Sequence, residues 1–323
     1  MRTAPSYSFD VWCERGCSRS SLPADTFRCA DSADDRKEPL YGTASYVKSW
    51  LLLEQPGSWG RDALRQSRLP EPVARELRRR TREAGIRMVL IRRGAGLATT
   101  ERQCYFARAD ARNPHLSRMS LGRAEDLLDV DLSPISMGGE VDGATECSKP
   151  LFLVCTHGRH DACCSIRGNQ VSRVACATPG ADAWESSHIG GDRFAANLVC
   201  FPHGIYYGRV GPDDVSMLMD AYDLGRLSLD HLRGRCGHTF VVQAADYFVR
   251  RESGVTDIDG VSLVDTTKRG RQNLIATFAV AGRGHAQVEV RVDETAERYR
   301  LTCTANASEP IPRYELVSCV FHD

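Results

Sequence analysis

The chain has 323 residues, of which 42% are hydrophobic and 26% are charged, the balance of a soluble globular protein. Lysine plus arginine and aspartate plus glutamate both number 42, so the net charge is near zero, which argues against a general nucleic-acid or anionic-membrane binder. The longest apolar runs are too short to cross a bilayer, and the N-terminal residues contain no hydrophobic signal core. We therefore expect a cytoplasmic protein with no membrane or nucleic-acid partner.

The cysteines are numerous, with 13 spread along the chain. An odd number in a long, non-secreted chain indicates thiols, metal ligands or catalytic groups rather than disulfides. Free cysteine is also among the most buried residue types, so many of these side chains are expected in the core. Cys104 and Cys303, each within an apparent strand, are interpreted in this way. Only cysteines that cluster with other ligand types point to chemistry.

The first half of the chain predicts a polar segment over 1–37 and an α/β domain over 38–145. Proline at the start and glycine at the end of the stretch 72–85 mark a helix with its stop signal. Turn formers with little apolar pattern fill 133–150, which places a domain boundary there. The predicted elements are a buried strand at 50–54, a helix at 72–85, strands at 86–93 and 102–110 around a turn at 94–100, and a short helix within 123–132.

The second half predicts a thioredoxin-like domain over 146–237 and an α+β extension over 238–323. Alternating strands and helices imply a mostly parallel or mixed sheet with covered faces. The predicted fold class is therefore α/β with an α+β tail: two thioredoxin-like units, the second carrying the metal site, then a helix and antiparallel strands. The elements are strands at 151–156, 181–188 and 204–210, helices at 161–178, 192–200, 212–225 and 239–251, and antiparallel segments at 276–292 and 298–305.

Two short segments, "LVCTHGRHDACCS" (153–165) and "WESSHIGGDRF" (184–194), concentrate cysteine and histidine. Cys155 ends a predicted strand, and Cys164 stands in the first turn of the next helix, where a thiolate is favoured. His188 follows the next strand, and Asp192 comes four residues later. The carboxyl ends of adjacent strands meet in one crevice, so these side chains can converge. Soft sulfur ligands with imidazole suit an iron–sulfur cluster or zinc, whereas a lone histidine at a strand end is more often structural.

Several common motifs are missing from the sequence. The sequence contains no pair of C-x2-C motifs, which would indicate a zinc ribbon. It also contains no C-x-x-C motif, which would indicate a thioredoxin-type dithiol. No G-x-G-x-x-G follows a strand, which argues against a nicotinamide or flavin site. No carboxylate pair suited to glycoside hydrolysis can be placed.

The segments "CTHGRHDACC" and "WESSHIGGDRFAANLVCFPHGIYYGR", with "GTASYVKSWLLLEQPGSWGRDAL" upstream, resemble the sucrase/ferredoxin-like family, over about residues 40–320. The resemblance implies a thioredoxin-like ferredoxin domain with a 2Fe–2S cluster held by C-x8-C and H-x3-H ligands. Carried onto this chain, the ligands are Cys155, Cys164 and His188, while Asp192 stands where the family pattern has its second histidine. The fourth ligand is then Asp192 or one of these alternatives: Cys163, His157, Cys200 or an external group.

The resemblance implies a 2Fe–2S electron-transfer protein, a one-electron carrier for partner proteins that act as reductase and acceptor. An aspartate in place of the second imidazole predicts a lower reduction potential than a bis-histidine site. The alternatives are a zinc-stabilised binding module with the same ligands, and a cysteine-dependent redox enzyme with Cys155 or Cys164 as nucleophile and His188 as base. The surroundings of the site are predicted to include His157, His160, Cys163, Gly190, Gly191 and Arg193.

Overall fold

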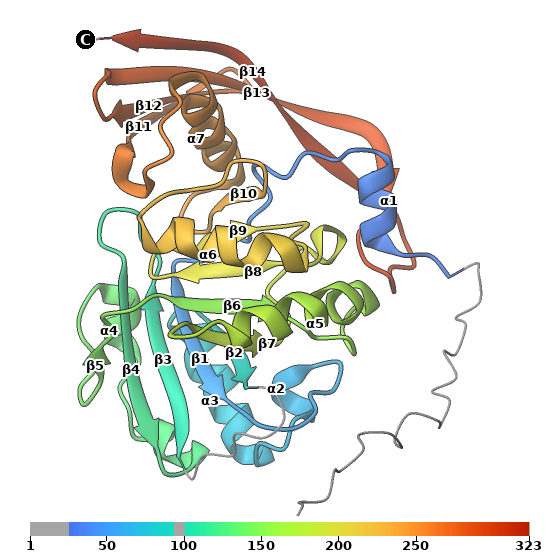
Figure 1. The fold of residues 1–323 in the computed structure, drawn as a ribbon, viewed down its shortest axis with the longest axis vertical. Helices are drawn as coiled ribbons and strands as arrows, with labels where there is room; N and C mark the ends of the chain where they lie inside the picture. Colours follow the sequence, from blue (N-terminus) through green and yellow to red (C-terminus); the bar gives the residue numbers. More distant parts are fainter. Residues whose placement is uncertain (1–25, 94–100, 323) are drawn as a thin grey trace, which may run out of the picture.

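Apolar strands assemble into a ten-stranded mixed sheet in the computed structural model, which describes residues 26–93 and 101–322 (Figure 1). The strand order is β10-β9-β8-β6-β7-β2-β1-β3-β4-β5. The strands are β1 (Ser49–Glu54), β2 (Ile86–Arg92), β3 (Arg102–Arg108), β4 (His115–Leu121), β5 (Thr145–Glu146), β6 (Leu151–Cys155), β7 (Asp182–Ser186), β8 (Leu198–Phe201), β9 (Ile205–Tyr207) and β10 (Leu232–Arg235).

The sheet curls strongly, so that two parts of the same face pack against each other. β1 and β8 are four places apart in the strand order, about 19 Å in a flat sheet. Nevertheless, the ring centroids of Trp50 on β1 and Phe201 on β8 are only 5.4 Å apart. Tyr105 and Trp184 make a similar edge contact at 5.9 Å. The central core therefore lies between the two halves of one sheet.

Helices cover the outer faces of the two halves. Leu51 and Leu53 of β1 point away from the central core and pack with Leu77 of α3 (Glu71–Glu83). On the other half, Phe152 and Val154 pack under α5 (Ala162–Ala177) and α6 (Val215–Asp223). The alternation of side chains along each strand thus separates an inner core from two helix-covered cores. The remaining helices of this part are α1 (Cys29–Asp35), α2 (Ala63–Gln66) and α4 (Ser133–Met137), with 3-10 turns at Ala124–Leu128, Asp192–Phe194 and Pro212–Asp214.

The C-terminal part is a helix on a four-stranded antiparallel meander. The apolar face of α7 (Phe240–Ser253), with Phe248 and Val249, packs on the alternate residues of the central strands. The strands are β11 (Val261–Arg269), β12 (Asn273–Val280), β13 (Gly284–Tyr299) and β14 (Glu309–His322), with a 3-10 turn at Ile258–Gly260. The β13–β14 ribbon is longer than its neighbours and reaches across the molecule to α1 (Figure 1).

The mixed α/β class with a separate antiparallel part is confirmed. The domain boundaries stay predictions, and the antiparallel β2–β7 pair joins the two predicted α/β units into one sheet. The predicted helix at 192–200 is wrong, because only Asp192–Phe194 turns helically and Leu198–Phe201 pairs with β6 as a strand. The predicted strand at 298–305 is also wrong beyond Tyr299, because the chain turns away from β14 there.

Some sequence predictions lie outside the described residues, namely the turn at 94–100 and positions 1–25 of the polar segment. The rest of that segment contains α1, whose residues Cys29, Ala30 and Ala33 are buried. Among the described residues, no helix is both long and apolar enough to span a bilayer.

His203 generates a prediction about pH and stability. Burial lowers the pKa of His203 to about 4, and its Nδ1 lies 2.6 Å from the hydroxyl of Tyr222. The unfolded chain, with an ordinary pKa near 6.5, takes up this proton first as the pH falls, so folding stability decreases from about pH 6.5 toward pH 4. His203→Asn keeps an acceptor for Tyr222 but cannot titrate. Between pH 7 and 4.5, urea unfolding of the wild type should lose about 2 kcal/mol more than the variant. Equal losses would contradict a neutral buried His203.

Candidate metal centre

The site is built at the carboxyl ends of two parallel neighbours, β6 and β7. Cys155 is the last residue of β6, in register with Ser186 at the end of β7. The amide of Thr156 donates to the carbonyl of Ser186 at 3.2 Å, which keeps the two strand ends together as they leave the sheet. The loop that follows β7 carries His188. The topology therefore brings the two sequence segments to one crevice.

Helix α5 brings Cys164 to the same place. Asp161 caps the helix by accepting a hydrogen bond from the amide of Cys163 at 2.9 Å, so Cys164 lies in the first turn. Gly168 faces the end of β6, and a Cβ there would lie 2.1 Å from the carbonyl oxygen of Cys155. The missing side chain therefore lets the helix pack directly on the strand end. Both Cys155 and Cys164 are 1% exposed.

Two glycines fold the loop after β7 back over the thiols. Gly190 and Gly191 have φ angles of +99° and +81°, which other residues rarely adopt. Arg233, fully buried behind them, donates to the carbonyl of Gly190 at 3.1 Å and to Asn197 Oδ1 at 2.7 Å. The turn presents Asp192, whose Oδ1 lies 3.1 Å from Cys164 Sγ and 3.0 Å from His188 Nδ1. Arg233 was missed at the sequence level because no local motif marks it.

The four predicted ligand residues thus lie together. Donor atoms of Cys155, Cys164 and His188 are within 4.8 Å of one another, and those of His160, His188 and Asp192 form an overlapping group. His188 Nδ1 is buried and makes no well-directed hydrogen bond within the described residues, although the Asp192 carboxylate is near. A buried donor atom of this kind is suited to a metal ligand.

The electrostatics of the group favour anionic sulfur. The hydrogen bond from the Cys164 thiol lowers the pKa of Cys155, and the same contact, together with burial, raises the pKa of Cys164. Burial opposes protonation of His188, but Asp192 and Cys155 outweigh it and raise the pKa of His188 to about 9. The charges of Cys155, His188 and Asp192 therefore favour one another. Metal ligands must be deprotonated, so a metal that takes these donors displaces their protons.

Two further histidines flank the site. His157 uses both ring nitrogens, because Nε2 donates to the Gly60 carbonyl at 2.6 Å and Nδ1 accepts from the His188 amide at 3.2 Å. It therefore orients the loop and has no free donor atom for a metal. His160 stacks on His188, with ring centroids 3.7 Å apart, and its Nε2 is 3.8 Å from Asp192 Oδ2.

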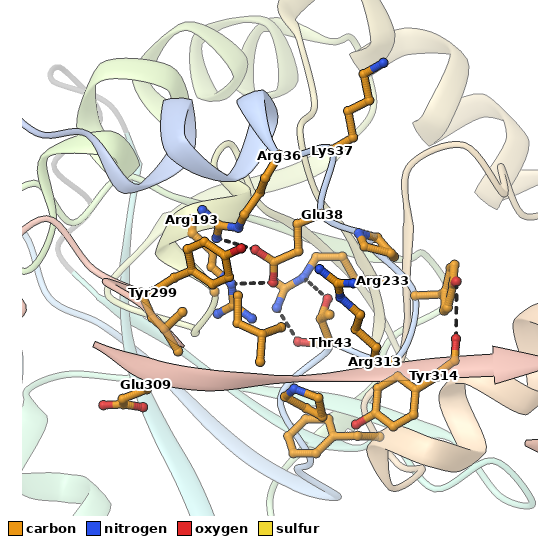
Figure 2. A pocket seen from close by; sticks show the side chains of 18 residues that line it. Arg36, Lys37, Glu38, Thr43, Arg193, Arg233, Tyr299, Glu309, Arg313 and Tyr314 are labelled. Carbon is orange, nitrogen blue, oxygen red and sulfur yellow. Dashed lines mark hydrogen bonds and ion pairs between the residues drawn. The ribbon is translucent and has the colours of Figure 1, made fainter. Parts of the chain in front are cut away.

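The other sequence candidates lie elsewhere. Cys200 is in the core under α5 and α6. Cys163 lies beside Cys29 and Cys303, not beside Cys155 and His188. Arg193 lies 2.8 Å from Glu38 and lines a cavity of about 640 Å³ between the 37–43 segment and β14. Figure 2 shows Arg36 and Arg193 meeting at Glu38 in this cavity.

The histidine side of the site is open. A groove of about 870 Å³ is bordered by His157, His160 and His188 from the site. The rest of its lining comes from the 61–66 segment, α3 and β2, and it carries Arg61 and Arg82 together with Arg78, which pairs with Asp62 at 2.8 Å. The thiols are buried beneath, so the imidazoles are the part of the centre nearest to solvent.

A family model described as Sucrase/ferredoxin-like matches residues 40–234. Altered inheritance of mitochondria protein 32 from Meyerozyma guilliermondii is 32% identical over 80 residues, 22% of this chain and 28% of that protein. The match therefore spans less than a third of that relative.

Two solved structures are also similar to part of the chain. They are the Cys59Ser and Cys55Ser variants of the thioredoxin-like [2Fe-2S] ferredoxin from Aquifex aeolicus, named with their own numbering. Each has 16% identity and a TM-score of 0.24, and covers 27% of this chain and 99% of its own.

The close packing of α5 on the end of β6 can be tested with Gly168→Ala. The added methyl meets backbone that cannot move independently, so the helix must shift, at a cost of about 3 kcal/mol in unfolding free energy. Urea denaturation measures the change. Arg173→Ala, at an exposed position of the same helix, should change stability by less than about 0.5 kcal/mol. A similarly small effect of Gly168→Ala would contradict the close packing of α5 on the end of β6.

Proposed function

This chain belongs to the sucrase/ferredoxin-like family, and on that premise we propose that it binds a 2Fe–2S cluster and carries single electrons between partner proteins. The proposed ligands are Cys155, Cys164, His188 and Asp192. The observation that carries the proposal is the convergence of two buried thiols, an imidazole and a carboxylate at the ends of adjacent parallel strands.

The donor set fits such a cluster in its chemistry. Thiolates hold iron–sulfur clusters, and imidazoles can replace two of them on one iron. Here the imidazole and the carboxylate, His188 and Asp192, are adjacent, and the two thiols form the other pair. When bound, the cluster would supply a one-electron redox centre. The buried Cys155 and Cys164 would exclude water from its sulfur side, and a carboxylate ligand would return negative charge to the other side.

The groove suggests how a partner protein reaches the centre. His160 and His188 border it, with side-chain exposures of 33% and 25%, whereas the thiols are closed off. A partner seated in the groove would therefore approach the imidazole side. Arg61 and Arg82 in the lining of the groove favour a partner with an acidic surface, because complementary charge steers association.

One alternative is supported by a specific distance. The donor atoms of Cys155, Cys164 and His188 lie within 4.8 Å of one another, a spacing that a single tetrahedral zinc ion also accepts. Zinc at this place would make the domain a binding module rather than an electron carrier. A cysteine-dependent enzyme is less well supported, because Cys155 and Cys164 are each 1% exposed, whereas reactive cysteines are partly exposed.

Iron and acid-labile sulfide distinguish these functions. Anaerobically purified protein should contain about two of each per chain and absorb visible light, whereas a zinc protein is colourless. Cys155→Ser should lower both contents at least about fivefold, because a buried ligand is lost. Cys176→Ser, at an exposed position of α5, should leave them unchanged. Fresh wild-type protein without iron and sulfide would refute the proposal.

The role of Asp192 is tested by Asp192→His. Replacing an anionic ligand by a neutral imidazole makes the oxidised cluster less negative, so the reduction potential should rise, on the order of 100 mV. Redox titration monitored by visible absorption at a fixed pH gives the potential. The matched change Asp213→His, at an exposed site, should have no effect. A cluster-containing Asp192→His variant with an unchanged potential would show that Asp192 is not a ligand.

A further inference from the structure

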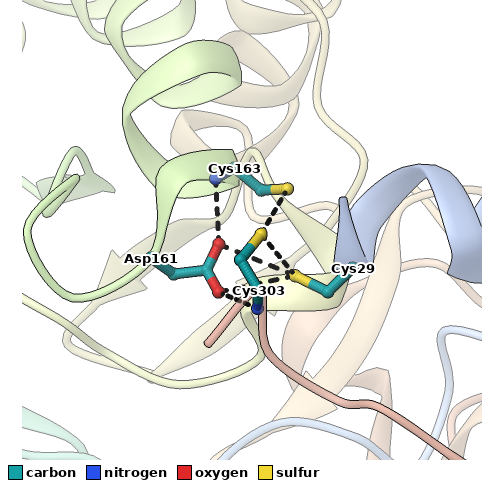
Figure 3. A group of neighbouring side chains, drawn as sticks. All are labelled: Cys29, Asp161, Cys163 and Cys303. Atoms are coloured by element: carbon teal, nitrogen blue, oxygen red, sulfur yellow. Dashed lines mark hydrogen bonds between the residues drawn. The ribbon is translucent and has the colours of Figure 1, made fainter. Parts of the chain in front are cut away.

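A second cluster of side chains that can bind a metal lies at the N-terminus of α5 (Figure 3). It consists of Cys29 from α1, Asp161 and Cys163 from the start of α5, and Cys303 from the turn after β13. Cys303 Sγ lies 3.4 Å from Cys163 Sγ and 3.6 Å from Cys29 Sγ. Cys29 Sγ is 3.6 Å from both carboxylate oxygens of Asp161. The electron-transfer site described above uses none of these residues.

The cluster is almost closed to solvent. Cys29, Asp161 and Cys163 are 0%, 1% and 2% exposed, and Cys303 is half-buried. The group combines one carboxylate with three thiols, which are all ligand types that zinc accepts. Charged groups enclosed in a protein are paired or coordinate a metal ion, so a bound metal would offset the cost of enclosing these donors.

We propose that Cys29, Asp161, Cys163 and Cys303 bind one zinc ion as a structural site. With Zn–S bonds of about 2.3 Å and Zn–O bonds of about 2.1 Å, the edges of a tetrahedron measure about 3.8 Å between two sulfurs and about 3.6 Å between sulfur and oxygen. The recorded distances lie within about 0.4 Å of these values. These distances cover three of the six edges, and all four ligand atoms lie within 4.8 Å of one another, a spacing that a single tetrahedral ion can bridge.

The orientation of Asp161 supports the assignment. Its Oδ1 accepts from the amide of Cys163 at 2.9 Å and its Oδ2 accepts from the amide of Cys303 at 2.6 Å. Each carboxylate oxygen has a second lone pair, which leaves one free for the metal. Hydrogen bonds of this kind fix the direction of a ligand and are typical around metal sites.

A zinc ion here would join three segments that are far apart in the sequence. It would fasten α1 and the turn after β13 to the helix that carries Cys164. Other contacts follow the same path: Arg167 of α5 pairs with Asp31 at 2.6 Å and with Asp34 at 2.7 Å, both in α1. Four protein ligands leave no open position, so the ion is structural rather than catalytic.

Zinc analysis of the full-length protein, purified without metal-affinity resin, tests the proposal. The wild type should contain about one zinc per chain, and Cys29→Ser and Cys303→Ser should reduce it at least about fivefold. Cys319→Ser, at another half-buried thiol of the C-terminal sheet, should retain it. Cys155→Ser should lose iron but keep zinc, and Cys303→Ser should lose zinc but keep iron, so this site and the 2Fe–2S proposal can fail separately.

A ligand exchange covers the case in which the serine variants do not fold. Cys303→His keeps a zinc ligand, so it should retain zinc, and its cobalt-substituted form should show weaker sulfur-to-metal absorption than the wild type. Three results would overturn the proposal: wild-type protein without zinc, zinc that is lost in Cys155→Ser but not in Cys303→Ser, or an intact mass about 2 Da low that maps to a disulfide among Cys29, Cys163 and Cys303.

Discussion

The contact of helix α5 with the end of strand β6 is the constraint on which the rest of the site depends. Because Gly168 has no side chain, the helix lies against the carbonyl of Cys155, and its first turn reaches the strand end. This packing contact sets the distance between the thiols of Cys155 and Cys164 and brings Cys164 Sγ to 3.1 Å from Asp192 Oδ1. A methyl group at position 168 would push α5 away from β6 and so move Cys164 away from Cys155 and Asp192, although no ligand residue is changed.

The same first turn serves two groups of ligands. Adjacent residues of a helix point about 100° apart, so Cys163 and Cys164 face different surroundings. Cys164 joins Cys155 and His188, whereas Cys163 joins Cys29 and Cys303. Asp161 belongs to the second group and also caps the helix. An interaction that fixes the Asp161 carboxylate therefore also fixes the first turn of α5, which carries Cys164. The two groups are therefore mechanically linked although they share no residue.

Local patterns were sufficient for part of this structure. The strand that ends at Cys155, the helix that begins at Asp161 and the place of Gly190 and Gly191 beside the site could be predicted, because each depends on neighbours in sequence. The segment 192–200 has helix-forming alanines, and its strand is created by pairing with β6, which no local signal reports. Cys303 was assigned to a strand core for a similar reason: its partners lie 140 and 274 residues away. Long-range contacts, not propensities, decide both positions.

The donor group is asymmetric in its exposure to solvent. The thiols are buried between β6 and α5, whereas His160 and His188 border the groove. His160 extends this side outward by stacking on His188 at 3.7 Å between ring centroids. Since electron transfer weakens steeply with distance, a partner in the groove would couple through these rings rather than through sulfur. Asp192 Oδ1 lies between His188 Nδ1 and Cys164 Sγ, so under the proposed function its charge would act directly beside the redox centre.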